Sequence, residues 1–239
     1  MQPTSDTYDA LLVAGARKEV RCIIGDTAYS AASRVTYTYT KIVSGTITAS
    51  LMDRAASIGN ASVKQLNLVL RDYSEIPRTA QIRVQFRLKK GNTASEWLPK
   101  GTFFVDTRDE GNGIISITAF DPMLKADRSY TTNGNQSGWP KTDLAVVQAI
   151  CSRIGVTLDP RTTEVMTNRY QIQYPGYGDG AYTMRELLQF IAAAYAGNFY
   201  ITDENKLLLV GLGDFPAQTN YLVTELNDCI LIGGYRILV

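Results

Sequence analysis

Two aspartates and an arginine stand close together in the sequence, at Asp121, Asp127 and Arg128. A pair of facing carboxyl groups could perform general acid–base catalysis, with one group protonated and the other ionised. Asp121, however, ends an alternating run and is followed by Pro122, which suits the first position of a helix. The pattern therefore favours Asp121 as the N-cap of a short turn. Asp127 and Arg128 are interpreted as surface or ion-pair groups.

A second candidate is the glycine-rich stretch YPGYGDGAY, which ends at Tyr182. A phosphate-binding loop needs a Lys-Ser/Thr pair at the start of the following helix. This loop lacks that pair, and Glu186 would repel a phosphate, so the pattern favours a surface loop. Its tyrosines, Tyr174, Tyr177 and Tyr182, could alternatively form an aromatic platform for a sugar or a partner.

Histidine is absent from the 239 residues. This absence excludes Ser-His-Asp and Cys-His nucleophile systems and zinc sites ligated by histidine. Cys22, Cys151 and Cys229 stand far apart and form no CxxC pair, which fits free thiols in a reducing cytosol. The sequence therefore assigns no catalytic, metal-binding or cofactor-binding residue, and we expect no cofactor.

The charges nearly cancel: 24 basic and 23 acidic side chains give a net charge of +1. Such a balance gives no electrostatic reason to expect specific nucleic-acid binding. Arg83, Arg87 and Lys89 could touch nucleic acid, but the solvated face of a strand explains them more simply. The first 20 residues lack the pattern of a signal peptide, and their apolar run, 10–14, is too short to span a bilayer. We expect no membrane anchor.

The elements that must position these residues are mainly strands. Alternation of apolar residues, many of them β-branched or aromatic, predicts about seven short strands in the first ~130 residues. They lie within residues 18–40 (two strands), 44–53, 64–72, 80–92, 101–113 and 113–120. Frequent turns between short strands are typical of a small barrel or sandwich.

The apolar period becomes helical after residue 138. It predicts one helix within 139–155, which begins near Thr142 or Asp143 and ends at Gly155. A second helix within 182–197 begins with a capping box formed by Thr183 and Glu186. A hairpin follows in 198–212, and the apolar segment 221–239 is again strand-like and needs a pairing partner.

These elements predict an α+β fold that is mainly β, with small antiparallel β-barrels or sandwiches and a two-helix insertion. We expect an N-terminal barrel-like domain in 1–130 and a helical insertion with loops in 131–198. The strands in 199–239 would complete a second barrel or return to the first.

Three loose motifs carry a resemblance to the N-terminal part of bacteriophage and prophage tail-hub (baseplate hub) proteins. They are G-x-F-x-V-D at 101–106, I-x-A-F-D with an apolar turn at 117–124, and I-G-V-x-L at 154–158. The order of β domain, helical insertion and NFYIT-DENK-LLLV hairpin is also similar to that family, over most of residues 18–212.

The resemblance implies a structural protein and not an enzyme. It implies a homotrimer at the tail tip, made in the cytoplasm of the host bacterium. Such a trimer joins the sixfold tail tube or distal tail protein to a threefold tip that carries a spike, a fibre or a wall-degrading module. Two rivals stay open: a carbohydrate-binding receptor module that uses the three tyrosines, and a cell-wall hydrolase that uses Asp121 or Glu186.

Overall fold

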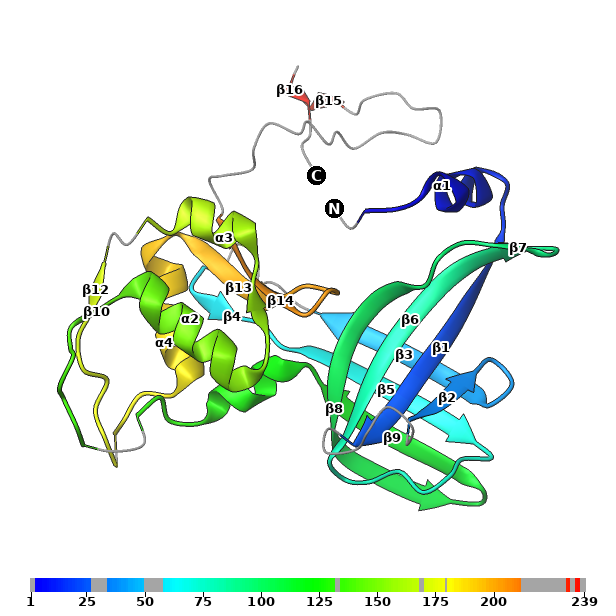
Figure 1. Cartoon of the computed structure of the whole chain (residues 1–239), viewed down its shortest axis with the longest axis horizontal. Coiled ribbons are helices and arrows are strands. Elements are labelled where there is room, and N and C mark those ends of the chain that lie inside the picture. Colours follow the sequence, from blue (N-terminus) through cyan, green and yellow to red (C-terminus); the bar gives the residue numbers. More distant parts are fainter. Residues whose placement is uncertain are drawn as a thin grey trace.

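The structure is a computed structural model that comprises two packed units and a separate short hairpin (Figure 1). One unit is a curled antiparallel sheet, and the other is a smaller sheet covered by helices. The predicted α+β, mainly β fold is confirmed. The structure describes residues 3–26, 34–49, 58–131, 134–167, 170–178, 180–211, 231–232 and 235–236.

The large sheet has the strand order β2-β1-β6-β8-β9-β5-β3, with β7 added beside β6, and all its pairs are antiparallel. Its strands are β1 (Arg17–Asp26), β2 (Val35–Thr38), β3 (Ile42–Ala49), β5 (Lys64–Arg71), β6 (Ala80–Lys90), β7 (Thr93–Ala94), β8 (Leu98–Gly111) and β9 (Ile114–Phe120). The strands predicted in the first ~130 residues are thereby confirmed. The connection between the two strands predicted in 18–40 and the end of the segment 44–53 lie partly outside the described residues.

Alternating residues explain which face of this sheet forms the core. In β6, Ile82, Val84 and Phe86 are buried, whereas Arg83 between them is exposed. One face of the sheet therefore packs inward and the other meets water, as is typical of antiparallel strands. The inward faces of β1, β5, β6, β8 and β9 form one apolar cluster.

The two ends of the sheet order, β2 and β3, follow each other in the sequence and are joined by residues 39–41. β2 pairs with Arg21–Ile24 of β1, while β3 turns away and pairs with β5. Arg17–Val20 of β1 pair with β6 on one side, but no described strand pairs with them on the other side or with the outer edge of β3. The curled sheet is thus open along a seam between β1 and β3.

The second unit is built around a four-stranded sheet of order β11-β14-β13-β4, with α2 and α4 packed beside it (Figure 1). Its elements are β4 (Asn60–Ala61), η2 (Pro122–Asp127), α2 (Asp143–Ile154), β11 (Thr157–Leu158), α3 (Pro160–Val165), α4 (Met184–Ala194), β13 (Gly197–Ile201) and β14 (Lys206–Gly211). The pair β10 (Lys141–Thr142) and β12 (Gln171–Ile172) lies beside α2.

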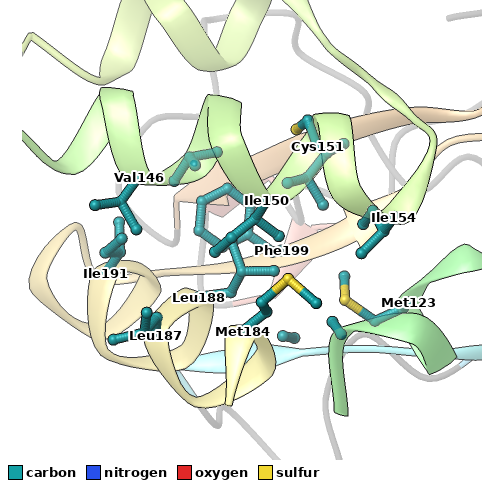
Figure 2. Close-up of a cluster of buried hydrophobic side chains, with 14 of the residues drawn as sticks. Met123, Val146, Ile150, Cys151, Ile154, Met184, Leu187, Leu188, Ile191 and Phe199 are labelled. Atoms are coloured by element: carbon teal, nitrogen blue, oxygen red, sulfur yellow. The ribbon is translucent and has the colours of Figure 1, made fainter. Parts of the chain in front are cut away.

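Both predicted helices and their predicted ends are confirmed. Thr142 is the N-cap of α2, and Gly155 ends the helix in the left-handed conformation that glycine tolerates best. Thr183 and Glu186 form the predicted capping box of α4. Phe199 lies between the apolar faces of the two helices (Figure 2).

The second core draws on distant parts of the chain. Met123 of η2 belongs to it, and β4 pairs in parallel with β13. The chain therefore crosses twice from the large sheet into this unit before α2 begins. The division into 1–130, 131–198 and 199–239 stays a prediction.

Two short elements complete the described chain. The helix α1 (Asp6–Val13), which the sequence analysis missed, is capped by Ser5 and contacts β6. β15 (Leu231–Ile232) pairs with β16 (Tyr235–Arg236) as a separate two-stranded sheet. The rest of the predicted strand segment 221–239 lies outside the described residues.

Candidate functional site

Asp121 lies where β9 ends and η2 begins. Its carboxylate accepts hydrogen bonds from the backbone N–H groups of Met123 and Lys64, each at 3.1 Å. The predicted N-cap role is therefore confirmed. The residue is only 2% exposed, and burial raises the pKa of its carboxyl to about 6, against the N–H donors and the nearby Lys64 and Arg185, which lower it.

Asp127 does not share a site with Asp121. Its carboxylate forms an ion pair with Arg185 of α4. The Arg185 guanidinium also donates to the carbonyl oxygens of Ala61 and Met123, so it links η2, β4 and α4. The ion-pair role predicted for Asp127 is confirmed, and the charged trio of the sequence does not assemble into an acid–base pair.

A hollow lined mostly by charged and polar side chains lies where the two units meet, and we call it the junction pocket. It has a volume of about 230 Å³. Lys64 belongs to the large sheet, whereas the other lining residues belong to the second unit. The lining is made by Lys64, Asp159, Arg161, Tyr200, Thr202, Asp203 and Glu204.

Asp203 holds the two units together across this pocket. It lies at the turn between β13 and β14, and its carboxylate accepts hydrogen bonds from Lys64 Nζ at 2.8 Å and Lys100 Nζ at 2.9 Å. Burial acts to raise the pKa of Asp203, but the two lysines outweigh burial and lower it. The carboxylate is therefore ionised at neutral pH and is paired with the ammonium groups of both lysines.

Asp159 caps α3 on the opposite wall. It accepts from the Arg161 backbone N–H at 3.1 Å and from two guanidinium nitrogens of Arg161 at 2.9 Å each. The bonds from Arg161 lower the pKa of Asp159 despite its burial. A bidentate arginine–carboxylate pair is among the stronger polar contacts in proteins.

This arrangement gives the junction pocket little capacity for acid–base chemistry. A general acid or base works best with a pKa near the working pH. The pKa values of Asp159 and Asp203 are both lowered, and each carboxylate is neutralised by a cation in contact. The ion pairs of Asp203 with Lys64 and Lys100 therefore join the two units, and neither Asp159 nor Asp203 is free to act as an acid or a base.

The second carboxylate considered for chemistry, Glu186, is also engaged. Its side chain accepts from the Thr183 backbone N–H and hydroxyl at 2.8 Å each, and these bonds lower its pKa. In the part of the chain that the structure describes, no group of three or more His, Cys, Asp or Glu residues could hold a metal ion. Cys22 and Cys151 are buried, which raises the pKa of each thiol to about 12.

The three tyrosines of the glycine-rich stretch have different surroundings. The Tyr174 ring packs edge-on against Trp139 at 5.9 Å, as expected of a residue that fixes a loop. Tyr182 is exposed and lies edge-on to the exposed Phe190 ring of α4 at 5.2 Å. Tyr177 is 58% exposed.

The basic row on β6 faces water and a neighbouring strand, as predicted. Arg87 forms an ion pair with Glu19 of β1 at 2.9 Å and lies over the Trp97 ring at 4.5 Å. Lys89 approaches the same Glu19 at 3.8 Å. These contacts explain the row as the outer face of a strand, with the Trp97 ring packed under Arg87.

Local sequence patterns do not point to the residues that form the junction. No local motif marks the residues that meet there, which are Lys64, Lys100, Asp159, Arg161 and Asp203. One signal was present: Lys64 shares the inward side of β5 with Leu66 and Leu68. A lysine on an inward face needs a carboxylate partner, because an unpaired buried charge is costly.

The comparisons with known proteins gave structural neighbours only. No protein-family model matches the chain, and no curated protein matches it significantly. The chain is similar to the 43 kDa tail protein of prophage MuSo2 from Shewanella oneidensis, with 17% identity, a TM-score of 0.48 and coverage of 82% of this chain and 56% of that one.

It is also similar to prophage tail protein gp18 from Listeria monocytogenes EGD-e. There the identity is 12%, the TM-score is 0.46, and the match covers 85% of this chain and 55% of that one. The chain thus spans about half the length of these solved structures. Among the described residues, no helix has both the length and the apolar character needed to cross a membrane.

Proposed function

We propose that this chain is a structural component of the tail of a phage or a phage-tail-like particle, and that it is not an enzyme. The observation that carries the proposal is the junction pocket, where Asp203 ties Lys64 and Lys100 of the large sheet to the second unit. Such contacts fix the two units relative to each other and leave the paired carboxylates unavailable as reactive groups. Asp121 and Glu186 support the same view, because each caps a helical segment.

The finer role that we propose is that of a baseplate hub at the tail tip. Three copies would assemble into a ring that joins the sixfold tail tube or distal tail protein to a threefold tip with a spike, a fibre or a wall-degrading module. The support is the sequence resemblance: its three motifs form the β6-facing part of β8, the β9–η2 connection and the end of α2. The two solved structures are likewise named as tail proteins.

Immunogold electron microscopy of tail particles tests this role. An antiserum against the purified chain should label one end of each tail, in particles released from the bacterium that encodes the chain. Label that is spread along the tails, or that is absent from particles and found only in the soluble lysate, would contradict a hub at the tip.

A carbohydrate-binding receptor module is the second candidate, because Tyr177 and Tyr182 are exposed on the loop before α4. Exposed aromatic rings can stack on sugar faces. Binding to a glycan array that is lost in Tyr177→Ala and Tyr182→Ala variants, but kept in a Tyr39→Ala variant of another exposed tyrosine, would favour this candidate.

A further inference from the structure

The outer face of β1 and β6 concentrates positive charge in a protein whose net charge is only +1. The strand register places the outward residues side by side, with Glu19 opposite Arg87 and Arg21 opposite Gln85. Among the outward positions that the structure describes on these two strands, Glu19 is the one acidic residue. Five cations accompany it, and we call them the basic strip: Arg17, Arg21, Arg83, Arg87 and Lys89.

Glu19 is already engaged by three members of the strip. Its side chain is 11% exposed, and it forms ion pairs with Arg17 at 3.0 Å, Arg87 at 2.9 Å and Lys89 at 3.8 Å. The hydrogen bond from Arg87 is the main reason that the pKa of Glu19 is lowered. No carboxylate of the described residues pairs with Arg21 or Arg83. The strip therefore has more positive charge than its own acid neutralises.

Arg21 is held in one position by its neighbours. Its Nε donates a hydrogen bond to Gln85 Oε1 at 2.8 Å, and its guanidinium lies 4.1 Å from the centroid of the Trp97 ring. The Arg87 guanidinium lies 4.5 Å from the same centroid. Partial burial, together with the nearby charge of Arg87, lowers the pKa of Arg21. A guanidinium that is fixed in place without a counter-ion is suited to bind a carboxylate, because little side-chain entropy is lost on binding.

The residue types in and around the strip are those of protein interfaces. Arg, Trp and Tyr dominate the energetic centres of such interfaces, whereas Lys is depleted there. Four of the five cations are arginines, and the Arg17 guanidinium lies 5.5 Å from the ring centroid of Tyr39, which is 66% exposed. Two guanidinium groups already cover the Trp97 ring, so it is poorly placed to stack on a nucleobase. The composition therefore favours a protein over a nucleic acid as the partner.

We propose that the basic strip is the docking surface for an acidic segment of another protein, whose carboxylates bind Arg21 and Arg83. Charge complementarity decides the class of partner, since five cations against one acid repel a basic surface and attract an acidic one. The helix α1 does not use this face, because it reaches β6 from the inward side, where Tyr8 packs on Phe86 with ring centroids 6.2 Å apart. The inference concerns a binding surface and does not depend on the proposed tail function.

Binding of a fluorescein-labelled poly-glutamate peptide, measured by fluorescence anisotropy, tests the proposal on the 239-residue chain. The wild type should bind the peptide at low ionic strength and release it as salt is added. Arg21→Gln combined with Arg83→Gln should weaken binding by about tenfold or more, because both unpaired guanidinium groups are lost. Failure of the wild type to bind the peptide would overturn the proposal.

The matched control is Arg78→Gln combined with Arg128→Gln. Both of these arginines are exposed and lie outside β1 and β6, and their replacement lowers the net charge by the same amount. The control should change the affinity by less than about twofold. Equal losses in the two double variants would show that the peptide responds to net charge alone, which contradicts a defined docking surface.

A single variant guards against an effect on folding. Because Arg83 is exposed, Arg83→Gln should keep the fold and still weaken binding by about threefold or more. Unchanged affinity in this variant would remove Arg83 from the surface and refute the proposal.

Two further measurements separate an acidic protein from other occupants. A labelled oligothymidylate that binds more tightly than poly-glutamate, and whose binding is lost when Arg21 and Arg83 are both replaced, would overturn the proposal in favour of a nucleic acid. Sedimentation of the wild type and of Arg83→Gln should give the same oligomeric state. A lower oligomeric state of the variant would instead assign the face to a second copy of this chain.

Discussion

Lys64 and Asp203 lie 139 positions apart in the sequence, and their charged groups are 2.8 Å apart in the structure. The first heads β5 of the large sheet and the second sits in the turn between β13 and β14. The Lys64 side chain is only 10% exposed, and Asp203 is its counter-ion. The pair fixes one unit on the other.

We expect Asp203→Asn to lower the free energy of unfolding by about 1–3 kcal/mol, because it leaves the charge of Lys64 without its counter-ion in a partly buried position. Urea denaturation at neutral pH measures this change. The control is Glu204→Gln, which removes the exposed ion pair between Glu204 and Lys206. The control should cost at most about 0.5 kcal/mol, and equal losses for the two variants would contradict the proposed role of Asp203.

Asp121 predicts a dependence of stability on pH. The pKa of its carboxyl is about 6 in the folded protein and ordinarily 3.8, so the folded protein keeps a proton that the unfolded chain loses. This contribution to stability is complete below about pH 4 and is lost as the pH rises through about 6. With Asp121→Asn as the reference, the wild type should lose up to ~3 kcal/mol of relative stability across that window.

Urea unfolding of both proteins at several pH values between 4 and 7 measures the difference. Comparison with the variant is necessary because Asp159 and Asp203, with lowered pKa values, act in the opposite direction in the wild type and cancel in the difference. A difference that stays constant, or that grows in favour of the wild type as the pH rises, would show that burial does not govern the titration of Asp121.

The capping box of α4 should contribute to the stability of the protein. Thr183→Ala removes the hydroxyl that accepts from the Glu186 backbone N–H at 3.1 Å and should lower the free energy of unfolding by about 1 kcal/mol. Ser152→Ala, on the exposed side of α2, should change it by less than about 0.5 kcal/mol. Thermal unfolding of the two variants checks this, and a larger loss for Ser152→Ala would contradict it.

The chain should not degrade cell walls on its own. We expect no release of dye from labelled peptidoglycan, because Asp121 and Glu186 are held by backbone donors and the acids of the junction pocket are paired. Lysozyme under the same conditions serves as the positive control. Activity that is abolished by Asp121→Asn or Glu186→Gln would instead establish the hydrolase alternative.

Local patterns in the sequence were sufficient for the longer strands of the large sheet, for the hairpin of β13 and β14, and for α2, α4 and their caps. In β6 the alternation of Ile82, Arg83 and Val84 sets a buried and a wet face without reference to any distant residue. Caps are equally local, since Thr183 and Glu186 satisfy donors within one turn. The short helix α1 escaped notice because its eight residues carry little apolar periodicity and bury only Leu11.

The junction could not be predicted in the same way, because it depends on residues that meet only after folding. Asp203 was interpreted as part of a hairpin turn, which it is, but nothing near it in the sequence points to Lys64 or Lys100. The surroundings of the three tyrosines could not be predicted for a related reason. Tyr174 and Tyr177 are close in the sequence, but Tyr174 packs against the distant Trp139 whereas Tyr177 is exposed.

The proposed homotrimer makes this polypeptide one subunit of a threefold structural assembly. Sedimentation equilibrium of the purified 239-residue chain measures its oligomeric state. We predict a single species of about 79 kDa, three times the 26.3 kDa mass of one chain, that persists on dilution. A 26.3 kDa monomer at all concentrations would contradict the claim.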